Sequence, residues 1–258
     1  MTPATCRAVQ AVAHQPRAQH GTTNRSQHCR ARSLHAQRVA CAETAADSSL
    51  AAWTRSVTLP SSQTLLVRPA QPADLAAAAA LLADAFAVSL RQPKYGRFLQ
   101  RQVTGYCAAR LQSPPHEGVL LVVTGGPEDG SMLGVCEVSL SPSTRSVQDA
   151  KLAAPQNSPY LSNISVLPAA RRQGIGAALL GAAQQYVVDA LRAGGADTAA
   201  LPPAVYLHCA IGDPAALALY TSAGFTVVAQ HAPWELPIFR QGVPRLQLMR
   251  RVLTPTTG

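Results

Sequence analysis

One segment constrains the fold of this chain more than any other. Residues 166–180 read Val-Leu-Pro-Ala-Ala-Arg-Arg-Gln-Gly-Ile-Gly-Ala-Ala-Leu-Leu, which predicts the end of a strand, a glycine turn and the start of a helix. The unpaired N–H groups and the positive dipole end of a first helical turn favour bound anions. Gly174 and Gly176 let a ligand approach the backbone, and Arg171 and Arg172 add positive charge. The segment therefore predicts a phosphate or pyrophosphate site within a strand–helix–strand unit.

Two better-known phosphate-binding motifs do not fit this segment. The dinucleotide fingerprint GxGxxG requires a third glycine where Leu179 stands, and the phosphate loop of nucleotide hydrolases requires a GK[ST] sequence that does not follow here. A glycine turn that serves packing alone is the remaining alternative. The paired arginines argue against it.

Apolar periodicity and turn residues predict the other elements. The turn-rich segment Gly125–Gly130 joins two apolar runs into an antiparallel hairpin, whereas the strand–helix–strand unit at Gly174 requires a parallel pair of strands. One α+β (mixed α/β) domain built around a mixed sheet follows. We expect strands over 65–68, 119–124, 132–140, 160–167, 205–211, 225–228 and 245–252, and helices over 75–90, 94–111, 174–191 and 213–223.

The amino-terminal segment has a different composition. Residues 1–42 contain no acid, and their six arginines recur among Ala, Ser, Thr, Gln and His. Such a composition is typical of an organelle transit peptide. The alternative is a disordered tail that has no targeting function. The plastid is favoured, with the mitochondrion second. We expect residues 1–53 to form this leader, with cleavage near 40–52, and residues 54–258 to form the folded domain.

Composition also bears on partners. The formal charge of +9 is spread over the chain, whereas nucleic-acid binding requires a clustered basic face. The longest apolar stretch, Leu75–Leu90, is interrupted by Asp84 and is too short for a membrane span. The six cysteines show no metal-binding spacing. We therefore expect a monomer that binds no nucleic acid, no membrane and no metal.

Three ordered segments carry a resemblance to a known family. Arg171–Gly176 (Arg-Arg-Gln-Gly-Ile-Gly) resembles the [RQ]xxG[xA][GA] acetyl-CoA motif of the Gcn5-related N-acetyltransferases (GNAT). Residues 66–75 resemble the family's opening strand and helix, and residues 215–225 resemble its terminal signature. The resemblance covers residues 65–253 and implies a splayed sheet of about seven strands flanked by about four helices. It also implies acetyl-CoA as co-substrate, with its pantetheine arm between the family's fourth and fifth strands.

The resemblance assigns expected roles residue by residue. Tyr220 stands where the family places the proton donor to the departing coenzyme A thiolate. Asp213 stands where the family usually has an Asn that contacts the cofactor arm, and Asp keeps the acceptor but loses the amide donors. The backbone that would bind the arm and the acetyl carbonyl belongs to Ile164, Ser165 and Val166. The turn that would cradle the pyrophosphate comprises Arg171, Arg172, Gln173, Gly174, Ile175, Gly176 and Ala177.

Three residues are candidates for the group that takes the proton from the amine. His208 stands where a eukaryotic Nα-acetyltransferase type has histidine, and imidazole, with a reference pKa of about 6.5, suits this task. Tyr160 matches a tyrosine of the same type. Glu137, flanked by apolar residues, is a rival base. For each of the three, a purely structural role is the alternative.

The acceptor is the least constrained part of the reaction. A protein α-amine has a reference pKa of about 7.7–8.0 against about 10.4 for lysine, so weak base catalysis favours amino termini. Residues 160–164, 206–208 and 248–253 resemble plant and algal plastid acetyltransferases, a group that combines amino-terminal and lysine acetylation. The resemblance and the leader imply a plastid N-acetyltransferase for protein amino termini and lysines. The substrate amine would attack acetyl-CoA directly, without a covalent acetyl-enzyme.

Two other functions stay open at this point. The same scaffold suits a small-amine acetyltransferase for arylalkylamines such as serotonin or for polyamines, although a polyamine site requires an acidic cleft and only 11 acids follow residue 53. The other alternative is a non-catalytic acyl-CoA-binding module. The presence of Tyr220 argues against it.

Overall fold

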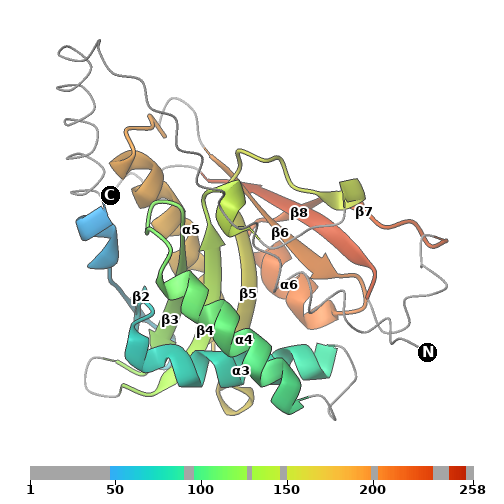
Figure 1. Ribbon diagram of the computed structural model, residues 1–258. Coiled ribbons are helices and arrows are strands. Elements are labelled where there is room, and N and C mark those ends of the chain that lie inside the picture. Colours follow the sequence, from blue (N-terminus) through green and yellow to red (C-terminus); the bar gives the residue numbers. More distant parts are fainter. Residues whose placement is uncertain are drawn as a thin grey trace, which may run out of the picture.

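The computed structural model describes residues 47–89, 96–126, 130–145, 150–198, 203–234 and 244–253. They form one sheet of eight strands with helices on both faces (Figure 1). The strands are β1 (Arg55–Thr58), β2 (Thr64–Pro69), β3 (Gly118–Thr124), β4 (Met132–Ser139), β5 (Tyr160–Val166), β6 (Ala204–Ala210), β7 (Thr226–Gln230) and β8 (Leu246–Val252). The longer helices are α3 (Leu75–Ser89), α4 (Gly96–Leu111), α5 (Ile175–Ala193) and α6 (Pro214–Ser222). None of the described helices is long and apolar enough to cross a membrane.

The strand order, β1-β2-β3-β4-β5-β6-β8-β7, confirms the mixed α+β fold. Strands β3 and β4 form the expected antiparallel hairpin, and β5 pairs with β6 in parallel because α5 carries the chain between them. The other neighbouring strands described in the sheet pair antiparallel. An apolar run such as β3 is stable here because helices cover both of its faces. Leu120 and Val122 contribute to the core cluster with α3 and α4, and Leu121 and Val123 to the cluster with α5.

The start of α3 confirms the helix-start signal in the sequence. The Asp74 carboxylate accepts a hydrogen bond from the Gln71 backbone N–H at 2.7 Å and forms an ion pair with Arg68 at 2.6 Å. Burial raises the pKa of Asp74, but the bonds from Arg68 and Gln71 together with the Arg68 charge outweigh this effect and leave the pKa lowered. The carboxylate is therefore ionised at neutral pH, where it caps the helix.

The folded part of the chain includes residues that we had expected in the leader. Residues 47–51 are helical, and Leu50 is only 3% exposed within the main core. The Trp53 indole N–H donates to Asp189 at 3.0 Å, and its ring meets Tyr186 edge-on. The Asp47 carboxylate lies 2.7 Å from Nδ1 of His116. Among the described residues, contacts with the domain thus begin at Asp47, and β1 is an additional strand that the sequence pattern did not predict. The remainder of the expected leader, residues 1–46, lies outside the described residues.

Candidate active site

The sheet opens between β5 and β6. These strands pair only at Tyr160↔Tyr206 and Leu161↔Leu207, and Figure 1 shows β6 and β8 inclined to β5 beyond that point. Residues 162–166 of β5 are half-buried although the strand lies in the middle of the sheet. None of them pairs with β6, which agrees with the splay that the resemblance implies. Ile164, Ser165 and Val166, expected to bind the cofactor arm, belong to this half-buried stretch.

The glycine turn follows directly after β5. Residues 171–174 are exposed, and α5 begins at Ile175 with Gly174 as its N-cap and no side chain capping it. The backbone N–H groups of Ile175, Gly176 and Ala177 lie in the first helical turn, where no acceptor within the helix is in reach. Arg171 is held against the strand end by a hydrogen bond from its Nε to the Val166 carbonyl at 3.0 Å. This set of amide donors, dipole and arginines fits the pyrophosphate of acetyl-CoA.

Two residues of the turn adopt left-handed backbone conformations. Arg172 has a φ of 66° and Gly174 a φ of 87°, so the chain reverses sharply between β5 and α5. A Cβ at Gly174 would also approach Leu59 to 3.4 Å. Glycine at this position therefore satisfies a backbone requirement, and its lack of a side chain leaves the turn open to a ligand.

Tyr220 lies on α6, behind the opening. Its side chain is 8% exposed and meets Phe225 edge-on. Burial raises the pKa of its hydroxyl, and the neighbouring Cys209 and Cys136 reinforce this effect. Tyr220 is therefore a phenol at neutral pH, which is the form that a proton donor requires. The Asp213 carboxylate caps α6 by accepting from the Ala216 backbone N–H at 2.9 Å, so its expected contact with the cofactor stays a prediction.

Tyr160 and His208 are in direct contact. The Tyr160 hydroxyl lies 2.6 Å from Nδ1 of His208, and Nε2 of His208 lies 2.9 Å from the Leu152 carbonyl oxygen. Because a carbonyl oxygen only accepts hydrogen bonds, Nε2 carries the hydrogen and Nδ1 of the neutral ring accepts from Tyr160. The three groups form a chain along which a proton can pass from the tyrosine oxygen to the imidazole.

Arg145 holds the segment that carries the Leu152 carbonyl. Its guanidinium donates to four backbone carbonyls of that segment, and its Cζ atom lies 5.5 Å from the centre of the Tyr160 ring. The four carbonyls belong to Ala154, Pro155, Gln156 and Ser158. Arg145 is a site residue that the sequence analysis missed, because an arginine in a polar loop carries no pattern that points to a distant tyrosine.

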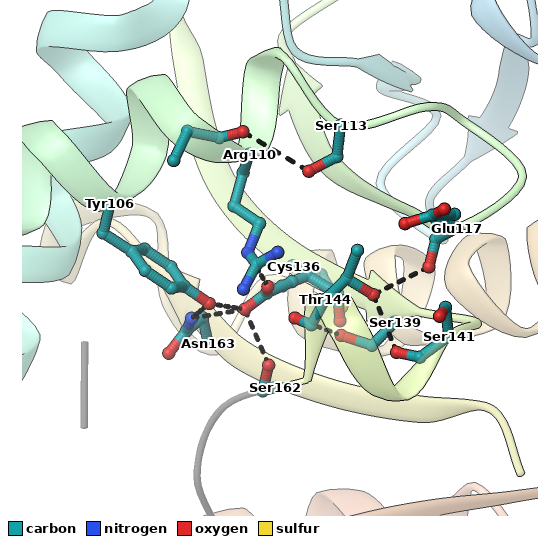
Figure 2. A network of polar contacts seen from close by, with 12 residues as sticks. Tyr106, Arg110, Ser113, Glu117, Cys136, Ser139, Ser141, Thr144, Ser162 and Asn163 are labelled. Atoms are coloured by element: carbon teal, nitrogen blue, oxygen red, sulfur yellow. Dashed lines mark hydrogen bonds and ion pairs between the residues drawn. The ribbon is translucent and has the colours of Figure 1, made fainter. Parts of the chain in front are cut away.

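Glu137, the rival base, contacts Tyr106 and Arg110 of α4. Figure 2 shows the polar network to which these two residues belong. Glu137 is fully buried, and one carboxylate oxygen lies 2.7 Å from Nε of Arg110. The other oxygen accepts from Tyr106, from Ser162 at 2.8 Å and from Asn163 at 2.7 Å. Burial raises the pKa of Glu137, while the Arg110 charge and these three donors act against the rise. One oxygen is thus ion-paired and the other accepts three hydrogen bonds, so Glu137 is poorly placed to take a proton from a substrate.

Comparisons with known proteins agree with this geometry. Residues 81–225 match the model of the acetyltransferase (GNAT) family. "GCN5-related N-acetyltransferase 5, chloroplastic" from Arabidopsis thaliana is 29% identical over 187 residues, which cover 68% of this chain and 54% of the relative. The chain thus spans about half the length of this curated relative.

Two solved structures share the fold. A spermidine N-acetyltransferase from Vibrio cholerae, in complex with CoA and spermine, aligns with a TM-score of 0.51 at 17% identity over 73% of this chain and 95% of that one. An uncharacterized protein from Bacillus halodurans aligns with a TM-score of 0.55 at 12% identity over 77% of this chain and 90% of that one. Because the family model covers more than half of its length, the chain belongs to the acetyltransferase (GNAT) family.

Proposed function

We propose that the protein is an acetyl-CoA-dependent N-acetyltransferase that modifies protein amino termini and lysine side chains in the plastid. The Tyr160–His208 contact carries the proposal, because it lies at the point where β5 and β6 separate and its imidazole suits proton uptake. His208 and Cys209 alternate along β6, so they face opposite sides of the sheet. Cys209 belongs to the core cluster that contains Tyr220, so acceptor and donor lie on opposite faces of the opening. The transit-like leader and the chloroplastic relative support the location.

The residues divide the chemistry between them. When bound, acetyl-CoA supplies an activated acetyl group, and its sulfur leaves as a thiolate. Tyr160 accepts a proton from the attacking amine and passes its own hydroxyl proton to Nδ1 of His208. The Leu152 carbonyl stays hydrogen-bonded to Nε2 of the same ring. Tyr220 donates its phenolic proton to the sulfur. A direct transfer needs no covalent acetyl-enzyme.

The charge near the site favours protein α-amines over polyamines. A polyamine site needs carboxylates that the amine can reach, but Glu137 is fully buried and lies 2.7 Å from Nε of Arg110. An imidazole is a weak base, which suits an amine that loses its proton near neutral pH. By reference pKa, α-amines do so about 2.5 units below lysine, so we expect amino termini to be the better acceptors.

Acetylation of a bacterial proteome tests this function. The chain from residue 47 onward is expressed as wild type, as Tyr220→Phe and as Tyr186→Phe, a matched loss of a buried hydroxyl that bonds only the Pro115 carbonyl among described contacts. Mass spectrometry then scores amino termini and lysines separately. We expect gains at both sites with wild type and Tyr186→Phe but not with Tyr220→Phe. No gain from folded wild-type protein that still binds acetyl-CoA would overturn the protein-acetylating function and favour small amines.

A further inference from the structure

The buried cluster around Glu137 has no part in the proton transfers proposed above. It comprises Tyr106 and Arg110 of α4, Glu137 of β4, and Ser162 and Asn163 of β5. Glu137 is fully buried and Arg110 is 7% exposed. Burying charged groups is costly even when they are paired. A role that offsets this cost is found in the backbone segments that the members of the cluster hold in place.

Asn163 is the member with an unusual backbone. Its φ is 54°, in the left-handed region that residues other than glycine rarely adopt. It lies at a bulge, because Val135 pairs with Ser165 and Glu137 pairs with Ser162, so that Asn163 and Ile164 together face Cys136. A bulge interrupts the ladder of hydrogen bonds and turns backbone groups away from the neighbouring strand.

The cluster fixes this bulge from the side of α4. The Asn163 amide donates to the Glu137 carboxylate at 2.7 Å and to the Tyr106 hydroxyl at 3.2 Å. Ser162, the preceding residue, donates to the same carboxylate oxygen. Figure 2 shows Tyr106 and Arg110 reaching from α4 toward Ser162 and Asn163. Two consecutive residues of β5 are thus tied to one buried carboxyl group immediately before Ile164.

We infer that Glu137 is a positioning residue: through Asn163 it holds the β5 bulge in the conformation that presents the Ile164 backbone to the acetyl group of the co-substrate. This inference rests on the proposed function, in which Ile164, Ser165 and Val166 bind the acetyl carbonyl and the arm. It gives Glu137 a task that requires an immobile carboxylate acceptor and no proton transfer. It also explains why an asparagine, which tolerates a positive φ, occupies this position of β5.

Binding of acetyl-CoA and of CoA to the full chain tests the inference, because only acetyl-CoA has the acetyl carbonyl. Calorimetry gives the ratio of the two dissociation constants for wild type, Glu137→Gln, Asn163→Ala and Asn163→Gly. We expect Glu137→Gln and Asn163→Ala to shift this ratio about fivefold toward CoA, the effect of one lost hydrogen bond. Asn163→Gly should shift it less, because glycine adopts the same φ without strain. Glu117→Gln removes a carboxylate bonded to Ser143 outside the cluster and should leave the ratio unchanged.

The possible results separate the inference from the function on which it rests. An unchanged ratio in Asn163→Ala, or equal weakening of both ligands, would overturn the inference even if the protein acetylates amines. If Glu137→Gln does not fold, the comparison of Asn163→Ala with Asn163→Gly still decides. A wild-type chain that folds but binds neither acetyl-CoA nor CoA would overturn the proposed function, and this inference with it.

Discussion

The Tyr160 hydroxyl and Nδ1 of His208, 2.6 Å apart, join β5 to β6 at the place where the two strands stop pairing. The parallel ladder ends at Leu161↔Leu207, so His208 is the first β6 residue beyond it. The pair therefore bridges the two strands at the end of their ladder, and in the proposed function it is the proton acceptor. The Leu152 carbonyl fixes which nitrogen of the ring accepts.

Replacing His208 by glutamine separates geometry from basicity. The glutamine amide offers a donor for the Leu152 carbonyl and an acceptor for Tyr160, but it takes up no proton near neutral pH. We expect kcat to fall about 100-fold with little change in KM for acetyl-CoA. Steady-state kinetics on a peptide with a free amino terminus measure both constants. Tyr206→Phe, which removes a hydroxyl from the same face of β6, should change neither. Wild-type kcat in the glutamine variant would refute the relay.

The pH dependence of kcat tests the protonation state of Tyr220. Burial is the largest cause of the raised pKa of its hydroxyl, and Cys209 and Cys136 raise this pKa further. A raised pKa keeps the phenol protonated to higher pH, so the proton donor is retained up to at least the ordinary tyrosine value of about 10. We expect a kcat profile with no alkaline decline between about pH 7 and 9.5, and a roughly 100-fold lower kcat for Tyr220→Phe over that range. An alkaline decline in the wild type that is absent from Tyr220→Phe would show that Tyr220 ionises earlier.

Features that depend on local chemistry could be predicted from the sequence. The hairpin follows from the glycines after β3, the start of α3 from Asp74, and the crossover from the turn before α5. Strand β1 could not be predicted, because it has four residues, is mostly exposed and carries no burial pattern. The glycine turn before α5 is a contiguous segment, so the sequence alone predicts it.

Contacts made only by tertiary packing left no such pattern. Tyr160 and His208 are 48 positions apart, and resemblance alone suggested them together. Nothing in the sequence indicated that Leu152 would bond His208. The sequence also did not show that Arg110 of α4 would lie against Glu137. This contact makes Glu137, a rival base in the sequence analysis, part of a buried polar cluster.

Residues 47–53 should stabilise the domain although composition groups them with the leader. Leu50 is buried in the main core, and Trp53 contacts Asp189 and Tyr186. Leu50→Ala should lower the free energy of unfolding by about 2–5 kcal/mol, and a chain starting at residue 54 should lose at least as much relative to one starting at 47. Denaturant titrations measure both differences. Val228→Ala, at a 48% exposed position, is the control and should cost far less. Equal stability of the two chain lengths would show that these contacts contribute nothing.

The same substitution at two glycines of the turn should destabilise the domain at Gly174 but not at Gly176. Gly174→Ala forces a side chain onto a backbone with a φ of 87°, which costs about 1–2 kcal/mol. Gly176 lies inside the first turn of α5, and a Cβ there meets Leu219 at an ordinary contact distance of 3.4 Å. Alanine favours a helix over glycine by up to about 1 kcal/mol, so Gly176→Ala should leave the free energy of unfolding unchanged or raise it. Urea titrations of both variants beside the wild type measure the difference. Equal destabilisation by the two substitutions would show that the left-handed φ of Gly174 is not what requires glycine there.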